Sequence, residues 1–210
     1  MRCTSEGRPA PRSDARDEPG WGLAEVPRGY AALFIPQLAW RKRSGSPGRL
    51  RDAGFYRALM DRAARAAGER DPGSLRITVV AHSAGYETAL AGLPHDPRID
   101  EVLLLDALYG GAAEFAAWLG ADPFRRVVSV HTGRGGPDRE TRALAKRVRR
   151  TEGPGAVRSG SADALPAVLG PRLTVLRTAV KHRDIPRARL VPLLEALVQA
   201  REKATAAPVQ

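Results

Sequence analysis

The chain alternates short apolar runs with segments of helical periodicity, and this alternation constrains its fold more than any other feature. The apolar runs are rich in β-branched and leucine side chains, which is typical of buried strands. They are "ALFIP", "LRITVVA", "IDEVLLLD", "FRRVVSVH" and "RLTVLRTAV". Strands that alternate with helices favour a mainly parallel sheet with helices on both faces. The sequence therefore predicts an α/β fold, a three-layer sandwich built around one such sheet.

Helices are predicted between these strands where apolar side chains recur three or four residues apart. The predicted helices cover Phe55–Ala66, Ala84–Leu93, Gly110–Gly120, Asp138–Arg150 and about Leu190–Lys203. Residues 152–171 are rich in glycine, proline and alanine, so a loop is predicted there. Residues 1–28 are polar and rich in arginine, proline and glycine. We expect them to form a flexible segment ahead of a single domain over 29–205.

Several large classes of function lack their signatures in this sequence. There is no G-x-x-x-x-G-K-[ST] pattern and no G-x-G-x-x-G after the first predicted strand, which argues against a nucleotide cofactor. A single cysteine, Cys3, and dispersed histidines argue against a metal site. No apolar run suits a transmembrane helix and no secretory signal is visible. We therefore expect a cytoplasmic protein without metal, cofactor or membrane span.

The net charge of +11 raises the question of a nucleic-acid partner. The basic residues are scattered along the chain, however, and cluster only at Arg41–Arg43 and Lys146–Arg150. No helix-turn-helix, zinc-finger or aromatic ribonucleoprotein pattern accompanies them. The charge by itself therefore argues weakly for nucleic acid, which we keep as a lesser hypothesis.

A serine follows the strongest predicted strand, in "RITVVAHSAGYETAL". The residues Ala81-His82-Ser83-Ala84-Gly85 fit the nucleophile-elbow pattern G-x-S-x-G, with alanine in the first glycine position. Such a turn needs small residues two positions before and after the serine, because they approach closely. It also places the backbone N–H of Ala84 at a helix N-terminus, where an oxyanion is stabilised. The simpler alternative is a small polar residue at an ordinary strand-to-helix junction. His82 is expected to pack beside the site.

A serine nucleophile needs a base, and the base needs an orienting acid. His182 follows the last predicted strand, in "TAVKHRDIP", and is the favoured base; His131 is its rival. Asp106 ends "EVLLLD" and is the favoured acid. Asp138 is the alternative acid, although it also suits a helix cap.

These residues together resemble the α/β-hydrolase superfamily, in an uncharacterised bacterial branch. The resemblance rests on "PQLAW", "SGSPG", "AHSAGY", "LLLDALYGG" and "HRDIP", and it spans about Tyr30 to Leu197. It implies an esterase-like or lipase-like serine hydrolase that acts on a small acyl substrate. Ser83 would be the nucleophile, His182 the base and Asp106 the acid. Tyr86 and Tyr109 are candidate substrate contacts, with Trp40 and Trp118, although ordinary packing explains all four equally well.

The sequence departs from the superfamily at its N-terminal side. The strand and the His-Gly loop that usually supply the second oxyanion donor are not found before Tyr30. One interpretation is a hydrolase-like domain that lacks its N-terminal strands and is weak or inactive, serving as a binding domain. The other is that "ALFIP" pairs directly with "ITVVA", so that the loop around Leu38 supplies the donor.

Overall fold

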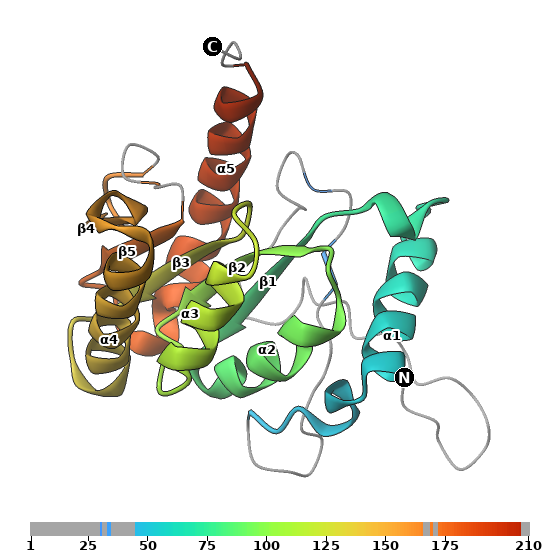
Figure 1. The fold of residues 1–210 in the computed structure, drawn as a ribbon, viewed down its shortest axis with the longest axis horizontal. Helices are drawn as coiled ribbons and strands as arrows, with labels where there is room; N and C mark the ends of the chain where they lie inside the picture. The colour runs from blue at the N-terminus through green and yellow to red at the C-terminus, as the bar shows by residue number, and fades with distance from the viewer. Residues whose placement is uncertain (1–29, 31–32, 35–44, 166–168, 170–171, 207–210) are drawn as a thin grey trace.

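The computed structural model describes residues 30, 33–34, 45–165, 169 and 172–206. Within these residues, five parallel strands form one sheet in the order β1-β2-β3-β5-β4 (Figure 1). The strands are β1 (Ile77–His82), β2 (Ile99–Leu105), β3 (Arg126–His131), β4 (Val157–Ser161) and β5 (Leu173–Arg177). Neighbouring strands pair in parallel throughout. The predicted α/β fold with a parallel sheet is confirmed.

Helices cover both faces of this sheet. One face carries α1 (Ala53–Ala66), α2 (Tyr86–Gly92), α3 (Ala112–Gly120) and α4 (Gly135–Glu152). The other face carries α5 (Ile185–Ala206). Short 3-10 turns link these elements: η2 (Gly48–Arg51), η3 (Pro72–Ser74), η4 (Ser83–Gly85), η5 (Leu93–His95), η6 (Pro154–Ala156) and η7 (His182–Asp184).

The alternating side chains of β2 explain why the protein has two apolar cores. Val102 and Leu104 pack among the helices of the α1–α4 face, whereas Leu103 and Leu105 pack against α5. All four side chains are almost fully buried. A strand covered on both faces has no solvent side, so it is expected to be apolar throughout rather than alternating.

Two of the sequence-based predictions are wrong in part. The stretch 152–171 contains a strand, β4, although a loop is predicted there. The helix predicted from about Leu190 begins at Ile185 instead. Pro186 lies in its first turn, where proline is tolerated, and Pro192 lies inside the helix. Residues 1–28, Leu38 and Trp40 lie outside the described residues, as does most of the "ALFIP" run.

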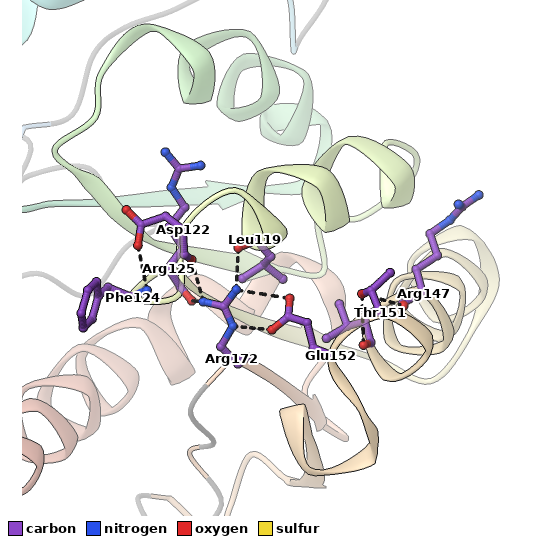
Figure 2. Close-up of polar contacts among 9 residues, drawn as sticks. Leu119, Asp122, Phe124, Arg125, Arg147, Thr151, Glu152 and Arg172 are labelled. Atoms are coloured by element: carbon purple, nitrogen blue, oxygen red, sulfur yellow. Dashed lines mark hydrogen bonds and ion pairs between the residues drawn. The ribbon is translucent and has the colours of Figure 1, made fainter.

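A partly buried arginine connects several elements at the amino-end edge of the sheet (Figure 2). Arg172 directly precedes β5, and its guanidinium donates to the backbone carbonyls of Leu119, Asp122 and Arg125. It also forms a two-pronged ion pair with Glu152 at 2.5 and 3.2 Å. These acceptors belong to the end of α3, the loop that follows it and the end of α4. One side chain thus joins the end of α3, the loop that follows it and the end of α4 through charge-assisted hydrogen bonds.

Candidate active site

Ser83 lies on a strained turn at the carboxyl end of β1. Its φ of 55° falls in the left-handed region, which costs a non-glycine residue on the order of 1–2 kcal/mol. Ala81 is buried, and a Cβ placed on Gly85 would lie 3.6 Å from the Ala81 Cβ. The residues two before and two after the serine therefore approach closely, as the nucleophile-elbow prediction requires.

Asp106 occupies the corresponding position at the end of the neighbouring strand. His82 and Leu105 are register partners in β1 and β2, so Ser83 and Asp106 both follow directly after a paired position. Asp106 also has a left-handed backbone, with φ 46°, and is 3 % exposed. Its Oδ1 accepts a hydrogen bond from the backbone N–H of Thr132 at 3.0 Å, and the Thr132 hydroxyl lies 3.4 Å away.

The other oxygen of Asp106 holds His182. The Nδ1 of His182 donates to Asp106 Oδ2 at 2.8 Å, across 76 positions of sequence. Because an ionised carboxylate only accepts hydrogen bonds, the proton of neutral His182 resides on Nδ1. Its Nε2 is then the basic nitrogen. The His182 side chain is 38 % exposed, so this nitrogen belongs to a side chain that is open to solvent and to a substrate.

His82 supports the loop that carries His182. The two imidazole rings stack with centroids 4.6 Å apart, and His82 Nε2 lies 3.0 Å from the backbone carbonyl of His182. Burial lowers the pKa of His82, which favours the neutral ring, with Nε2–H donating to that carbonyl. His82 thus packs beside the site, as the sequence predicts.

Ser83 follows the strand next to that of Asp106, but its hydroxyl is not hydrogen-bonded to this pair. Among the described residues, no hydrogen bond connects Ser83 to His182. Catalytic hydrogen bonds are often long before a substrate binds. The arrangement is therefore an aspartate–histidine pair beside a strained serine, with the serine–histidine contact unmade.

The rival residues form a separate contact at the end of β3. His131 is 6 % exposed, and its Nδ1 accepts from the backbone N–H of Gly133 at 3.1 Å. Asp138 Oδ1 lies 3.4 Å from the same nitrogen, which would be an ion pair only with a protonated ring. Burial lowers the His131 pKa, and the bond from Gly133 requires an unprotonated Nδ1, so the ring is neutral. Asp138 instead pairs with Arg142 at 2.9 Å.

Two tyrosines form a wall next to His182. Tyr109 is 43 % exposed and meets the His182 ring edge-on, with centroids 6.3 Å apart. Tyr86 lies 6.4 Å from Tyr109 by the same measure. Trp118, in contrast, is buried in the core with the Arg125 guanidinium 4.9 Å from its ring, so it does not line the site.

Two residues that contribute to the site, Thr132 and Gly45, are not predicted from the sequence. Thr132 orients Asp106, yet a threonine after a strand is too common to signal this role. Gly45 lies against the serine turn: a Cβ placed on it would come within 2.6 Å of the Ala84 carbonyl oxygen. The Thr88 hydroxyl donates to the Gly45 carbonyl at 3.2 Å and fixes this approach. The "SGSPG" run is the only sequence signal of this packing.

A hollow of about 840 Å³ opens at the loop that carries His182, and His182 and Thr132 both line it. Such a volume is typical of sites for small organic molecules. Among the described residues, no group of three or more histidine, cysteine or acidic side chains is placed to hold a metal ion.

No helix in the described part of the chain is both long and apolar enough to cross a membrane. Comparison of the chain with protein-family models, with curated proteins and with solved structures finds no match.

Proposed function

We propose that this chain is a serine hydrolase, esterase-like or lipase-like, that cleaves an ester or related acyl bond with Ser83, His182 and Asp106. The observation that carries the proposal is the 2.8 Å hydrogen bond from His182 to Asp106 beside the strained Ser83 turn. All three residues follow strands of one parallel sheet, at the edge where such sheets usually bind ligands. This is the arrangement that an α/β-hydrolase-like fold would use.

In the first half of the proposed reaction, the Ser83 hydroxyl oxygen attacks the substrate carbonyl carbon and its proton passes to Nε2 of His182. Asp106 accepts from Nδ1 and stabilises the imidazolium that forms. The backbone N–H of Ala84 donates to the oxyanion. When the intermediate collapses, the leaving alcohol takes the proton from Nε2 and the acyl group remains on Ser83.

In the second half, a water molecule attacks the acyl carbon and gives its proton to Nε2. Collapse of the second intermediate releases the carboxylic acid and returns the proton to the Ser83 oxygen. Leu38, the candidate for the second oxyanion donor, lies outside the described residues. A second donor is worth about 100- to 1000-fold in rate, so its presence decides between a fast and a slow enzyme.

The second candidate function is a non-catalytic binding domain on the same fold. The absence of a Ser83–His182 hydrogen bond among the described residues favours it. It predicts a folded protein whose serine does not react with electrophiles.

One experiment separates the two candidates: intact-mass analysis after incubation with a fluorophosphonate, on the wild type and on Ser83→Ala. The hydrolase proposal expects one adduct on the wild type and none on the variant. Circular dichroism of both proteins verifies that they are folded. A folded wild type that stays unlabelled contradicts the hydrolase proposal and favours the binding domain.

A further inference from the structure

Three cationic side chains line the hollow beside His182: Arg134, Arg177 and Lys181. All three residues are exposed, and within the described part of the chain none of them forms an ion pair with a carboxylate. The acidic residue in the same wall, Asp163, is paired with Arg189. The hollow therefore holds an excess of positive charge that no carboxylate of the described residues neutralises.

The Arg177 side chain needs a glycine opposite it. A Cβ placed on Gly133 would lie 2.6 Å from Arg177 Nε, so the arginine lies directly across this glycine. Gly133 has φ +77°, which also disfavours other residues. In addition, α4 begins at Gly135, directly after Arg134, and the N-terminus of a helix this long contributes further positive potential.

The hollow lies on the histidine side of the proposed catalytic centre. It extends over the ends of β3, β4 and β5, and its wall includes His182 itself. In the proposed reaction, His182 delivers its proton to the leaving oxygen, so the alcohol portion of the substrate lies on this side of Ser83. Strands are spaced about 4.8 Å apart, which places the end of β5 about 14 Å from that of β1.

From these observations, and resting on the proposed function, we propose that the substrate is an ester whose alcohol portion carries a carboxylate or phosphate, which binds in the hollow lined by Arg134, Arg177 and Lys181. A guanidinium donates two parallel hydrogen bonds to either group, and so it recognises the shared chemistry of charged oxygens.

The test compares acetate esters of rigid phenols that carry either an anionic or a neutral group. The esters are 4-acetoxycinnamate and 4-acetoxyphenyl phosphate, both anionic, and the neutral 4-acetoxycinnamamide. We expect kcat/KM to be about tenfold or more higher for at least one anionic ester, because the contact is a charge-assisted hydrogen bond. The phosphate ester distinguishes a phosphate preference from a carboxylate preference.

Substitutions locate the source of that preference. Arg177→Gln and Arg134→Gln each reduce the anionic-to-neutral ratio several-fold. Arg150→Gln, an exposed change of the same charge near the end of α4, preserves the ratio. A wild-type ratio near one, or a ratio that falls equally in all three variants, overturns the proposal.

A binding measurement separates failure of this proposal from failure of the proposed function. Calorimetric titration of Ser83→Ala with 4-hydroxycinnamate needs no catalysis. We expect Arg177→Gln in the same background to raise the Kd about tenfold and Arg150→Gln to leave it unchanged. If the serine is unreactive but this pattern holds, the anion site stands without the hydrolase. The same titration is made with 4-hydroxyphenyl phosphate, and if neither anion binds, or if both bind equally to all variants, the anion site is wrong whatever the serine does.

Discussion

At the residue scale, the backbone conformation of Ser83 and Asp106 points to the site before any chemistry is considered. Ser83 and Asp106 are the non-glycine residues with positive φ in the described part of the chain. Each one directly follows a strand whose last residues are paired with the other strand. Strain of this kind persists only where surrounding structure enforces it, and it concentrates at functional positions.

The Asp106→Asn substitution tests the proposed acid. Asparagine tolerates the left-handed region, so the fold is expected to remain intact. The amide presents no charge to stabilise the imidazolium and no longer enforces the Nδ1–H tautomer of His182. We expect hydrolysis of a reactive ester to fall by about 10³- to 10⁴-fold. Asp138→Asn is the matched control and should retain most activity; the opposite ranking of the two variants would assign the acid to Asp138.

Two glycines provide a matched test of the packing behind the serine turn. Gly45 and Gly48 have φ of +88° and +52°, so alanine is strained at both. Only at Gly45 would the new Cβ clash, 2.6 Å from the Ala84 carbonyl oxygen, whereas at Gly48 it meets no described atom within 4 Å. We expect Gly45→Ala to slow fluorophosphonate labelling of Ser83 by about 100-fold, because the Ala84 N–H is displaced from the oxyanion.

In the same assay, Gly48→Ala should label at close to the wild-type rate. If Gly45→Ala also labels normally while remaining folded, the contact with Ala84 has no bearing on the reactivity of the serine. Thermal melts of both variants verify that the slower labelling is not caused by unfolding.

At the element scale, the success of sequence-based prediction follows burial. β2 and β3 are apolar runs because helices cover them on both faces, and so their sequence pattern locates them within a residue or two. β4 has the sequence Val-Arg-Ser-Gly-Ser and lies at the edge of the sheet. β4 is held in place by backbone pairing with β5, and such pairing requires no particular pattern of side chains. Edge strands of this kind are therefore missed.

The site divides in the same way. Ser83, Asp106 and His182 were predictable because each follows a recognisable strand, and carboxyl ends of parallel strands meet at one edge. Thr132 and Gly45 were not predictable, because their roles depend on tertiary contacts with Asp106 and Ala84. Local pattern carries no information about which loop lies against which turn.

The stability of the helix ends depends on Arg172, which gives a prediction at this scale. Arg172→Met leaves Glu152 without its cation and removes one or more hydrogen bonds from each of three backbone carbonyls. Breaking such a largely buried pair lowers the free energy of unfolding by about 3–5 kcal/mol. Urea denaturation measures the change. Arg150→Met, on an exposed position of α4, should change it by less than about 0.5 kcal/mol. Equal effects from both substitutions would show that the Arg172 cluster does not stabilise the fold.

At the scale of the whole molecule, the anchoring arginines and the candidate site occupy opposite edges of the sheet. Arg98 and Arg172 directly precede β2 and β5, and each is held by carboxylates and backbone carbonyls at the amino-end edge. The residues with strained backbones and the three cations that line the hollow lie at the carboxyl-end edge. Substitutions at the carboxyl-end edge can therefore change reactivity while the anchors at the other edge preserve the fold.

The neutral histidines make the stability of the whole molecule depend on pH. Burial lowers the pKa of both His82 and His131 below the ordinary 6.5. Between the lowered values and 6.5, the unfolded chain binds more protons than the folded protein. The contribution of the two neutral histidines to the free energy of unfolding is thus complete above about pH 6.5, and it is lost as the pH falls through the folded-state pKa values. We expect the urea midpoint to be constant between about pH 7 and 8 and to decrease from about pH 6.5 to pH 5.

His131→Asn isolates one of the two contributions. The asparagine side-chain oxygen can accept the hydrogen bond from Gly133 N–H that His131 Nδ1 accepts, but the amide does not titrate. The decrease in the urea midpoint between pH 6.5 and 5 should therefore be smaller in this variant than in the wild type. An equally steep decrease would mean that His131 takes up its proton in the folded protein as readily as in the unfolded chain, and so does not contribute to the pH dependence.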